Sequence, residues 1–163
     1  MTAIPPGSTI GILGSGQLGR MLAVAAAQLG YRCHIYAPES GPACDVAGGF
    51  TAGSYYETDL LAAFAKRCDV LTYEFENVPV EPLRALADFA PLRPGTRALE
   101  VAQDRAVEKA FARDNGGRTA PFALCNSRDE LDAALAQTGT PAILKTLRLG
   151  YDGKGQARIT PGD

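Results

Sequence analysis

A glycine-rich segment near the end of the sequence combines backbone freedom with positive charge. The stretch LRLGYDGKGQ, residues 147–156, holds three glycines, one lysine and one aspartate. Glycines let backbone amides approach phosphate oxygens closely. Within and beside this segment lie four cationic residues, Lys145, Arg148, Lys154 and Arg158. These residues predict a flexible lid over a polyphosphate, and the alternative is a glycine-rich hairpin turn with solvated charges.

Two further observations concern cations that need an anionic partner. Lys145 lies in an apolar stretch, PAILKT, and a buried unpaired ammonium is costly, so this lysine is predicted to have a partner. Arg105 follows Asp104, a predicted N-cap, and would stand in the first turn of a helix, where the helix dipole favours anions. Arg105 is therefore expected to face a negative group, and a surface arginine is the alternative.

A second glycine-rich turn stands near the N-terminus. Residues 14–19, GSGQLG, match G-x-G-x-x-G between a predicted strand and a helix, which brings backbone N–H groups to an anion at a helix N-terminus. An NAD site needs an acid about 20 residues further on. That acid is absent, because the second predicted strand ends in YAP, residues 36–38. NAD, another phosphate-bearing ligand and a purely structural turn all stay open from spacing alone.

Two carboxylates follow the fourth predicted strand, residues 69–73. Glu74 and Glu76 belong to TYEFEN, where a parallel strand ends, and α/β sheets place ligand contacts at that edge. If the strand continued that far, alternation would put both side chains on the same side. Either carboxylate could bind a sugar hydroxyl or an amine, and a solvated loop is the alternative.

Alternating strands and helices must position these residues. Strands are predicted over 8–13, 31–36, 50–52 and 69–73, and helices over 20–29, 59–66 and 80–87. This alternation is typical of βαβ units with a parallel sheet. Residues 1–95 are therefore expected to form a Rossmann-like α/β domain that ends at LRPG, where proline and glycine punctuate the chain.

Residues 96–163 are expected to form an α+β piece. The predicted elements are one or two helices over 96–113, an extended segment over 119–125, a helix from the capping box at Ser127 and Glu130 to about 138, and a hairpin of strands 141–147 and 156–159. A hairpin and two or three helices bury little core by themselves. This piece is therefore expected to be an unfinished domain of a longer protein.

Composition excludes several classes of protein. The net charge of −2 and the scattered basic residues argue against a nucleic-acid binder. The N-terminus lacks the features of a signal peptide, and the longest apolar run, MLAVAAAQLGY, is too short to cross a bilayer. The four cysteines form no CxxC pair and there is a single histidine, His34, so a zinc site is not expected and the thiols fit a reducing cytoplasm.

Six motifs in fixed order resemble a known family. GSGQLGRM, TYEFENVP, AQDRAVEK, TAPF, AILKT and GYDGKGQ are similar to the 5-(carboxyamino)imidazole ribonucleotide synthetases of the ATP-grasp superfamily, from about Thr9 to Ile159. The resemblance implies a Rossmann-like pre-ATP-grasp domain with a parallel sheet, followed by the beginning of an α+β ATP-grasp domain. It also implies a reaction of de novo purine biosynthesis: ATP, bicarbonate and 5-aminoimidazole ribonucleotide give the 5-carboxyamino product through carboxyphosphate.

The resemblance also implies a role for individual residues. Gln17, Leu18 and Glu74 would contact the aminoimidazole ribonucleotide, so the first glycine turn would serve this substrate. Tyr151 and Asp152 would be catalytic, with Asp152 as the general base that takes the proton as the C–N bond forms. The ATP site would consist of Arg105, Lys145, Gly150, Tyr151, Asp152, Gly153, Lys154, Gly155 and Gln156.

Several expectations concern cofactors and partners. The resemblance implies Mg²⁺ with ATP, no metal ligand within this chain, and an adenine pocket and acidic magnesium ligands beyond Asp163. It implies a cytoplasmic homodimer, with no nucleic-acid or membrane partner, and a 163-residue chain that is inactive alone. The alternatives are another ATP-grasp carboxylate-amine ligase, a non-catalytic nucleotide-binding module and an NAD-dependent oxidoreductase domain.

Overall fold

The computed structural model describes residues 3–150 and 153–162, and the chain divides into two compact units. The first unit is Met1–Leu99 and the second is Glu100–Asp163. The division falls inside helix α4 (Thr96–Ala102), whose Leu99 is buried in the core of the first unit.

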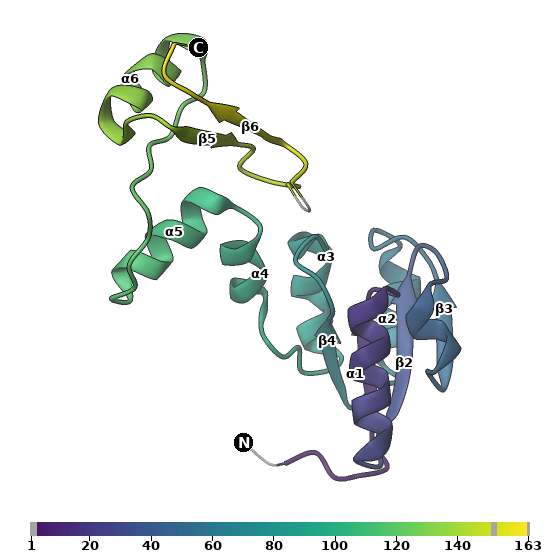
Figure 1. Ribbon diagram of the computed structural model, residues 1–163. Helices are drawn as coiled ribbons and strands as arrows, with labels where there is room; N and C mark the ends of the chain where they lie inside the picture. The colour runs from purple at the N-terminus through teal and green to yellow at the C-terminus, as the bar shows by residue number, and fades with distance from the viewer. Residues whose placement is uncertain (1–2, 151–152, 163) are drawn as a thin grey trace. The chain divides into compact units, whose positions relative to one another are not determined.

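Four parallel strands form the sheet of the first unit (Figure 1). Their order is β3-β2-β1-β4, with β1 at Thr9–Leu13, β2 at Arg32–Ala37, β3 at Gly49–Ala52 and β4 at Val70–Tyr73. Leu13, at the end of β1, pairs with Tyr36 on one side and Tyr73 on the other. The first glycine turn and the TYEFEN segment therefore both begin at the edge of the sheet that is formed by the carboxyl ends of its parallel strands.

Helices cover both faces of this sheet, as Figure 1 shows for α1 and α2. The helical segments are α1 (Gln17–Gln28), the 3-10 turn η1 (Pro42–Asp45), α2 (Thr58–Ala65), α3 (Val80–Arg84) and the 3-10 turn η2 (Ala85–Asp88). Alternation along β1 sends Ile12 into the core under α1 and Leu13 into the core under α2. The predicted α/β fold with a parallel sheet is confirmed.

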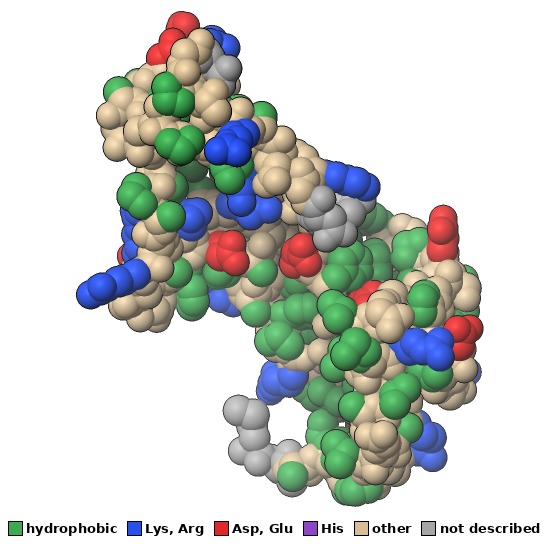
Figure 2. Space-filling model, viewed as in Figure 1, with side chains coloured by type: hydrophobic (Ala, Val, Ile, Leu, Met, Phe, Trp, Pro, Cys, Tyr) green, Lys and Arg blue, Asp and Glu red, His purple; other side chains and the backbone are tan. Residues whose placement is uncertain are grey.

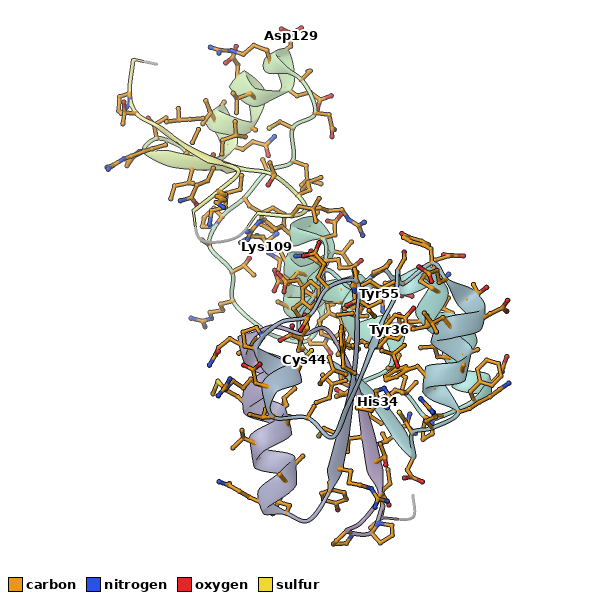
Figure 3. All side chains as sticks on the ribbon, turned by 90° about the vertical axis from the view of Figure 1, so that its right-hand side faces the viewer. His34, Tyr36, Cys44, Tyr55, Lys109 and Asp129 are labelled. Atoms are coloured by element: carbon orange, nitrogen blue, oxygen red, sulfur yellow. The ribbon has the colours of Figure 1, made fainter. Side chains whose placement is uncertain are left out.

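The core under α2 is built around aromatic rings. Tyr36 and Phe64 are fully buried, with ring centroids 5.1 Å apart, and the Tyr55 ring lies 5.9 Å from that of Tyr36 (Figure 3). Burying one such side chain stabilises a fold by about 1.5–3 kcal/mol. This core reaches the edge of the sheet where β2 ends, so it also fixes the backbone that carries the site.

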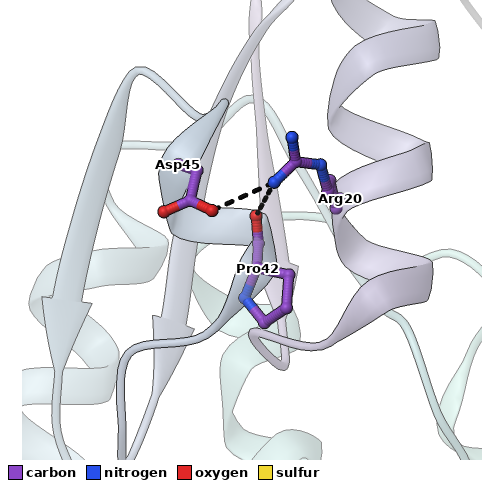
Figure 4. Close-up of polar contacts among 3 residues, drawn as sticks. All are labelled: Arg20, Pro42 and Asp45. Carbon is purple, nitrogen blue, oxygen red and sulfur yellow. Dashed lines mark hydrogen bonds and ion pairs between the residues drawn. The ribbon is translucent and has the colours of Figure 1, made fainter.

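The side chain of Arg20 links α1 to η1 on the other face of the sheet. The Arg20 guanidinium donates to the carbonyl of Pro42 at 3.4 Å and pairs with the carboxylate of Asp45 at 3.0 Å (Figure 4). Both side chains are exposed, so the pair contributes little stability.

Two sequence predictions for the first unit are wrong in detail. The helix predicted over 20–29 begins at Gln17, because Gly16 already serves as its N-cap. The helix predicted over 80–87 is divided into α3 and η2.

The second unit contains helices and a hairpin. Its elements after α4 are α5 (Arg105–Asp114), α6 (Arg128–Thr138), β5 (Ala142–Lys145) and β6 (Gln156–Ile159), and the two strands are antiparallel. Ser127 caps α6 by accepting from the backbone N–H of Glu130, as the capping-box pattern predicts. Residues 119–125 belong to no strand among the described residues.

The hairpin of the second unit buries little of its surface. Ala134 is the one buried residue of this unit in the described part of the chain, and Ile143 of β5 is 59% exposed. Lys145 is exposed as well, so the prediction of a buried ammonium that needs a partner was wrong for this residue. No helix in the described ranges has the length and apolar character needed to cross a bilayer.

Candidate functional sites

The first glycine turn leads from β1 directly into α1. Gly14 has φ +112°, a conformation that side chains rarely allow, and its N–H donates to the carbonyl of Tyr36 at 2.9 Å. Gly16 is the N-cap of α1 and has no side chain to accept from the first turn. The free N–H groups at this helix end therefore need an acceptor from elsewhere in the chain.

Glu74 supplies that acceptor. Its Oε1 accepts from the N–H of Gly16 at 2.6 Å, and its Oε2 accepts from the N–H of Gly19 at 2.6 Å. Glu74 follows β4 directly, and its own N–H donates to the carbonyl of Leu13 at 3.1 Å. A negative group at a helix N-terminus is favoured by the helix dipole, and here the neighbouring strand provides it.

The structure separates the two carboxylates of the TYEFEN segment. Strand β4 ends at Tyr73, so the condition for placing Glu74 and Glu76 on the same side is not met. Glu74 is half-buried against the turn, whereas Glu76 is exposed. Gln17 and Leu18, exposed in the first turn of α1, lie next to the glycines that Glu74 holds. The structure thus brings the three predicted substrate-contact residues to one edge of the sheet.

The Glu74 carboxylate influences a buried phenol. Burial first, then the negative charge of Glu74, then Tyr36, raise the pKa of Tyr55 to about 12. Tyr55 therefore stays protonated at neutral pH. This edge of the sheet carries one carboxylate at the turn and a neutral phenol nearby.

The second group of predicted residues begins at the N-terminus of α5. Asp104 caps this helix, because its Oδ1 accepts from the N–H groups of Ala106 and Val107 at 3.0 and 3.3 Å. The N-cap prediction is confirmed. The other oxygen of Asp104 lies 3.6 Å from Nε of Arg148, which belongs to the segment after β5.

Arg105 joins the start of α5 to the second glycine-rich segment. Its backbone N–H donates to the carbonyl of Leu147 at 3.0 Å, and its guanidinium Nη2 donates to the carbonyl of Gly150 at 3.0 Å. The negative group that Arg105 faces is therefore the partial charge of a backbone carbonyl. A guanidinium has five N–H donors, so donors remain for a further acceptor.

A pocket of about 730 Å³ brings three cations of the second unit together. Arg105, Lys109 and Lys145 line it, and Glu108 is the acidic residue in its lining. The same three cations line a smaller pocket of about 140 Å³. The prediction that Arg105 and Lys145 serve one ligand is therefore supported by their shared pocket.

Lys109 was missed in the sequence. It stands four residues after Arg105 in α5, and residues at this spacing share one face of a helix. Its Nζ lies 5.1 Å from the ring centroid of Phe122, and Cζ of Arg113 lies 4.3 Å from the same centroid (Figure 3 labels Lys109). The spacing alone could have identified Lys109, whereas its approach to Phe122 is a tertiary contact.

The second glycine-rich segment connects β5 to β6. The N–H of Thr146 donates to the carbonyl of Gly155 at 2.8 Å, and Gly153 and Gly155 have positive φ angles of +79° and +66°. Lys154 and Gln156 are exposed. The predicted catalytic residues Tyr151 and Asp152 lie outside the described residues. The described residues thus show the two paired strands of a hairpin, and closure of the segment over a ligand stays a prediction.

The lining of the larger pocket, and not the second unit as a whole, has an excess of positive charge, with three cations against Glu108. Figure 2 shows Lys and Arg side chains, in blue, and Asp and Glu side chains, in red, on the visible face of this unit. Within residues 3–150 and 153–162, no group of three or more His, Cys, Asp and Glu side chains could hold a metal ion.

All four cysteines of the chain are free thiols. In the first unit, burial raises the pKa of Cys68 to about 12, which leaves that thiol unreactive.

Comparisons with known proteins identify a family for each part of the chain. Residues 7–103 match the family described as ribonucleotide synthetase preATP-grasp domain, and residues 110–162 match the ATP-grasp domain. The N5-carboxyaminoimidazole ribonucleotide synthase of Brucella melitensis is 50% identical over 163 residues, which are 99% of this chain and 45% of that protein.

Solved structures of such synthases are similar in fold. The N5-carboxyaminoimidazole synthetase of Staphylococcus aureus complexed with ADP matches with a TM-score of 0.91 and 36% identity, over 98% of this chain and 43% of that one. The synthase of Aspergillus clavatus in complex with ADP and 5-aminoimidazole ribonucleotide matches with a TM-score of 0.81 and 29% identity, over 94% and 41%.

These matches confirm the resemblance inferred from the six motifs, and the chain spans less than half the length of each of these three relatives. The preATP-grasp match covers more than half of the chain and includes the glycine turn and Glu74. The chain therefore belongs to the ribonucleotide synthetase preATP-grasp domain family, and the beginning of an ATP-grasp domain follows.

Proposed function

We propose that this chain forms part of an ATP-dependent ligase that carboxylates 5-aminoimidazole ribonucleotide with bicarbonate in purine biosynthesis. The observation that carries the proposal is the identity of 50% to the Brucella melitensis synthase along 99% of this chain. The Aspergillus clavatus relative, which binds ADP and 5-aminoimidazole ribonucleotide, supports the choice of substrates. The clustering of Arg105 and Lys145 in one pocket supports the use of a polyphosphate.

The proposed reaction has two steps. An oxygen of bicarbonate attacks the γ-phosphorus of ATP, so that a P–O bond forms, carboxyphosphate is made and ADP leaves. The amine of the substrate then attacks the carboxyl carbon, a C–N bond forms and phosphate leaves. The nitrogen loses its proton as this bond forms, and we assign that proton to Asp152, with Tyr151 beside the reacting amine. A carboxylate is competent for this transfer because the nitrogen becomes acidic only as the bond forms.

Cations of the second unit would hold the ATP phosphates. The guanidinium of Arg105 can bind phosphate oxygens in a bidentate manner, and the ammonium of Lys145 can act as a point charge beside it. Backbone and side-chain donors would come from Gly150, Gly153, Lys154 and Gly155 in the connection between β5 and β6, and from Gln156, the first residue of β6. Lys109 lines the same pocket and adds a third positive charge.

The edge of the first unit would hold the ribonucleotide. Gln17 and Leu18 are exposed there, and Glu74 keeps unused lone pairs on both carboxylate oxygens. A ribose hydroxyl or the amine could donate to these lone pairs while the turn stays intact.

Magnesium would accompany ATP and neutralise its phosphate charge. The described residues offer no cluster of three or more metal-ligating side chains.

Two further properties follow from the family resemblance. We propose that the whole protein is a homodimer, which sedimentation at graded concentrations would test. A cytoplasmic location is supported by the free cysteines, because cytoplasmic thiols are kept reduced.

The decisive experiment measures ADP release by the whole protein, with and without 5-aminoimidazole ribonucleotide, at saturating bicarbonate and magnesium. We expect strong stimulation by the ribonucleotide, lost in Asp152→Asn and kept in Asp132→Asn, a change of an exposed carboxylate on α6. A folded, ATP-binding protein that shows no stimulation would contradict the substrate assignment and favour another ATP-grasp carboxylate-amine ligase.

A further inference from the structure

The three glycines of the G-x-G-x-x-G turn all lie against the side chain of Glu74. A Cβ added at Gly16 would stand 2.7 Å from Oε1 of Glu74, and one added at Gly19 would stand 3.3 Å from Oε2. A Cβ at Gly14 would meet Cγ of the same side chain. In dinucleotide-binding proteins these glycines make room for a ligand's pyrophosphate. Here the group for which they make room is a carboxylate of the chain itself.

We propose that Glu74 is a specificity-determining residue that fills the anion-binding place of the glycine turn and closes it to phosphate groups. The carboxylate takes the N–H groups of Gly16 and Gly19, each at 2.6 Å, which is the short length of a charge-assisted hydrogen bond. A phosphate that approached the same N–H groups would have to displace Glu74 or lie beside its negative charge. Either route opposes phosphate binding.

The segment after β2 supports the same conclusion independently. Ser15 donates from its Oγ to the carbonyl of Glu39 at 2.9 Å, and the N–H of Ala43 donates to the carbonyl of Ser15 at 2.9 Å. Gly41 lies so close to Ser15 that an added Cβ would meet its backbone oxygen. In a dinucleotide site this region after the second strand meets the ribose. In this chain it is tied to the turn by backbone and hydroxyl contacts.

A consequence for ligand recognition rests on the proposed function. Because Glu74 can accept further hydrogen bonds but cannot donate when ionised, this edge selects ligand groups that donate, such as hydroxyls or an amine. The phosphate of the ribonucleotide would then be bound away from the glycine turn. Glu74 would thus combine two roles, holding the turn and accepting from the substrate.

The test is titration of the ¹⁵N-labelled whole protein with inorganic pyrophosphate, followed at the amide resonances of Gly16 and Gly19. These resonances separate the turn from the cationic pocket of the second unit, which can also bind pyrophosphate. We expect no response at Gly16 and Gly19 in the wild type. In Glu74→Ala we expect both amides to respond, with a dissociation constant at least about tenfold below the highest pyrophosphate concentration that leaves the wild type unchanged, because each hydrogen bond to a charged group contributes at least that factor.

Two further variants serve as a control and as an alternative to Glu74→Ala. Glu76→Ala removes the exposed neighbouring carboxylate and should behave as the wild type. Glu74→Gln is nearly isosteric and can accept from only one of the two N–H groups, so amide hydrogen exchange should lose protection at either Gly16 or Gly19. This variant carries the test if Glu74→Ala does not fold.

A wild-type protein whose Gly16 and Gly19 amides respond to pyrophosphate would overturn the inference, as would a folded Glu74→Ala variant that binds no tighter. The titration involves no turnover, so its outcome is independent of ADP release. Failure of the proposed reaction would leave the closed anion site standing, and failure of the titration would leave the reaction standing.

Discussion

The two units of the chain hold their candidate sites in different ways. In the first unit the glycine turn and Glu74 lie at the edge of a sheet that is buried on both faces, and the carboxylate already has its N–H partners. In the second unit the pocket is built on a hairpin and helices with one buried residue in the described part of the chain. There Lys109 and Lys145 have no carboxylate partner among the described residues.

The difference shows how packing and ligand chemistry are linked. A site with satisfied hydrogen bonds on a close-packed scaffold is preorganised, and it discriminates between ligands because it excludes groups such as phosphate. A pocket whose two lysines have no carboxylate partner among the described residues keeps positive charge available for an anionic ligand. The second unit therefore depends on a ligand or on further packing much more than the first does.

The largest expected effect is a difference between the two units in how much a truncated apolar side chain lowers the free energy of unfolding. Phe64→Ala creates a cavity in the core of the first unit and should lower the free energy of unfolding by about 3–5 kcal/mol. Ile143→Ala, on the exposed hairpin, should change it by less than about 0.5 kcal/mol. Urea unfolding followed by circular dichroism measures both. A large loss from Ile143→Ala would mean that the hairpin is covered in the protein.

Removal of Lys145 should weaken ATP binding by about 10- to 100-fold, because a hydrogen bond to a charged group contributes about 1.5–3 kcal/mol. Calorimetric titration with ATP and magnesium measures the change. Arg158→Ala is the matched control, since this exposed cation of β6 does not line either pocket. Equal losses in the two variants would show that net charge, and not the pocket, holds the nucleotide.

Lys109→Ala should weaken ATP binding less, by about threefold to tenfold, since cation–π contact with Phe122 competes for its ammonium at about 0.5–1 kcal/mol. Arg113→Ala removes the other cation at the same ring and should leave ATP affinity unchanged, because Arg113 does not line either pocket. The same titration distinguishes them. An unchanged affinity in Lys109→Ala would remove this residue from the phosphate site.

A pH effect is expected in the first unit, which holds the single histidine. Burial, with a smaller contribution from Arg67, lowers the pKa of His34 below its ordinary 6.5. The unfolded chain therefore binds a proton more readily, and this contribution to stability is complete above pH 6.5 and decreases as the pH falls below that value. Urea midpoints measured across this range should decrease less in His34→Gln. The same slope in both proteins would assign the effect to other groups.

The smallest effect is expected for Arg20→Ala. Its pair with Asp45 is exposed, so the free energy of unfolding should fall by less than about 1 kcal/mol. The loss should shrink further in high salt because salt screens exposed charges. A larger loss that persists in high salt would indicate that the bond to the Pro42 carbonyl, and not the ion pair, ties η1 to α1.

Local patterns in the sequence were sufficient for most of the fold. Alternating apolar strands and helices predicted the parallel sheet, and Asp104 and Ser127 were identified as N-caps. These features succeed because each depends on residues a few positions apart, where backbone geometry fixes the spacing. The burial of Lys145 was misjudged because an apolar stretch does not show whether another layer covers it.

The site was predicted only in part. The motifs alone pointed to Glu74 and to the glycine turn, and the resemblance joined them as substrate contacts. That Glu74 lies on the turn and accepts from Gly16 and Gly19 is a contact across 58 and 55 residues, and no local pattern encodes it. The residue types and their order along the chain therefore determined the fold class and the family. The tertiary structure decided which acceptor fills the anion place, because only the pairing of β1 with β4 brings that carboxylate to the helix end.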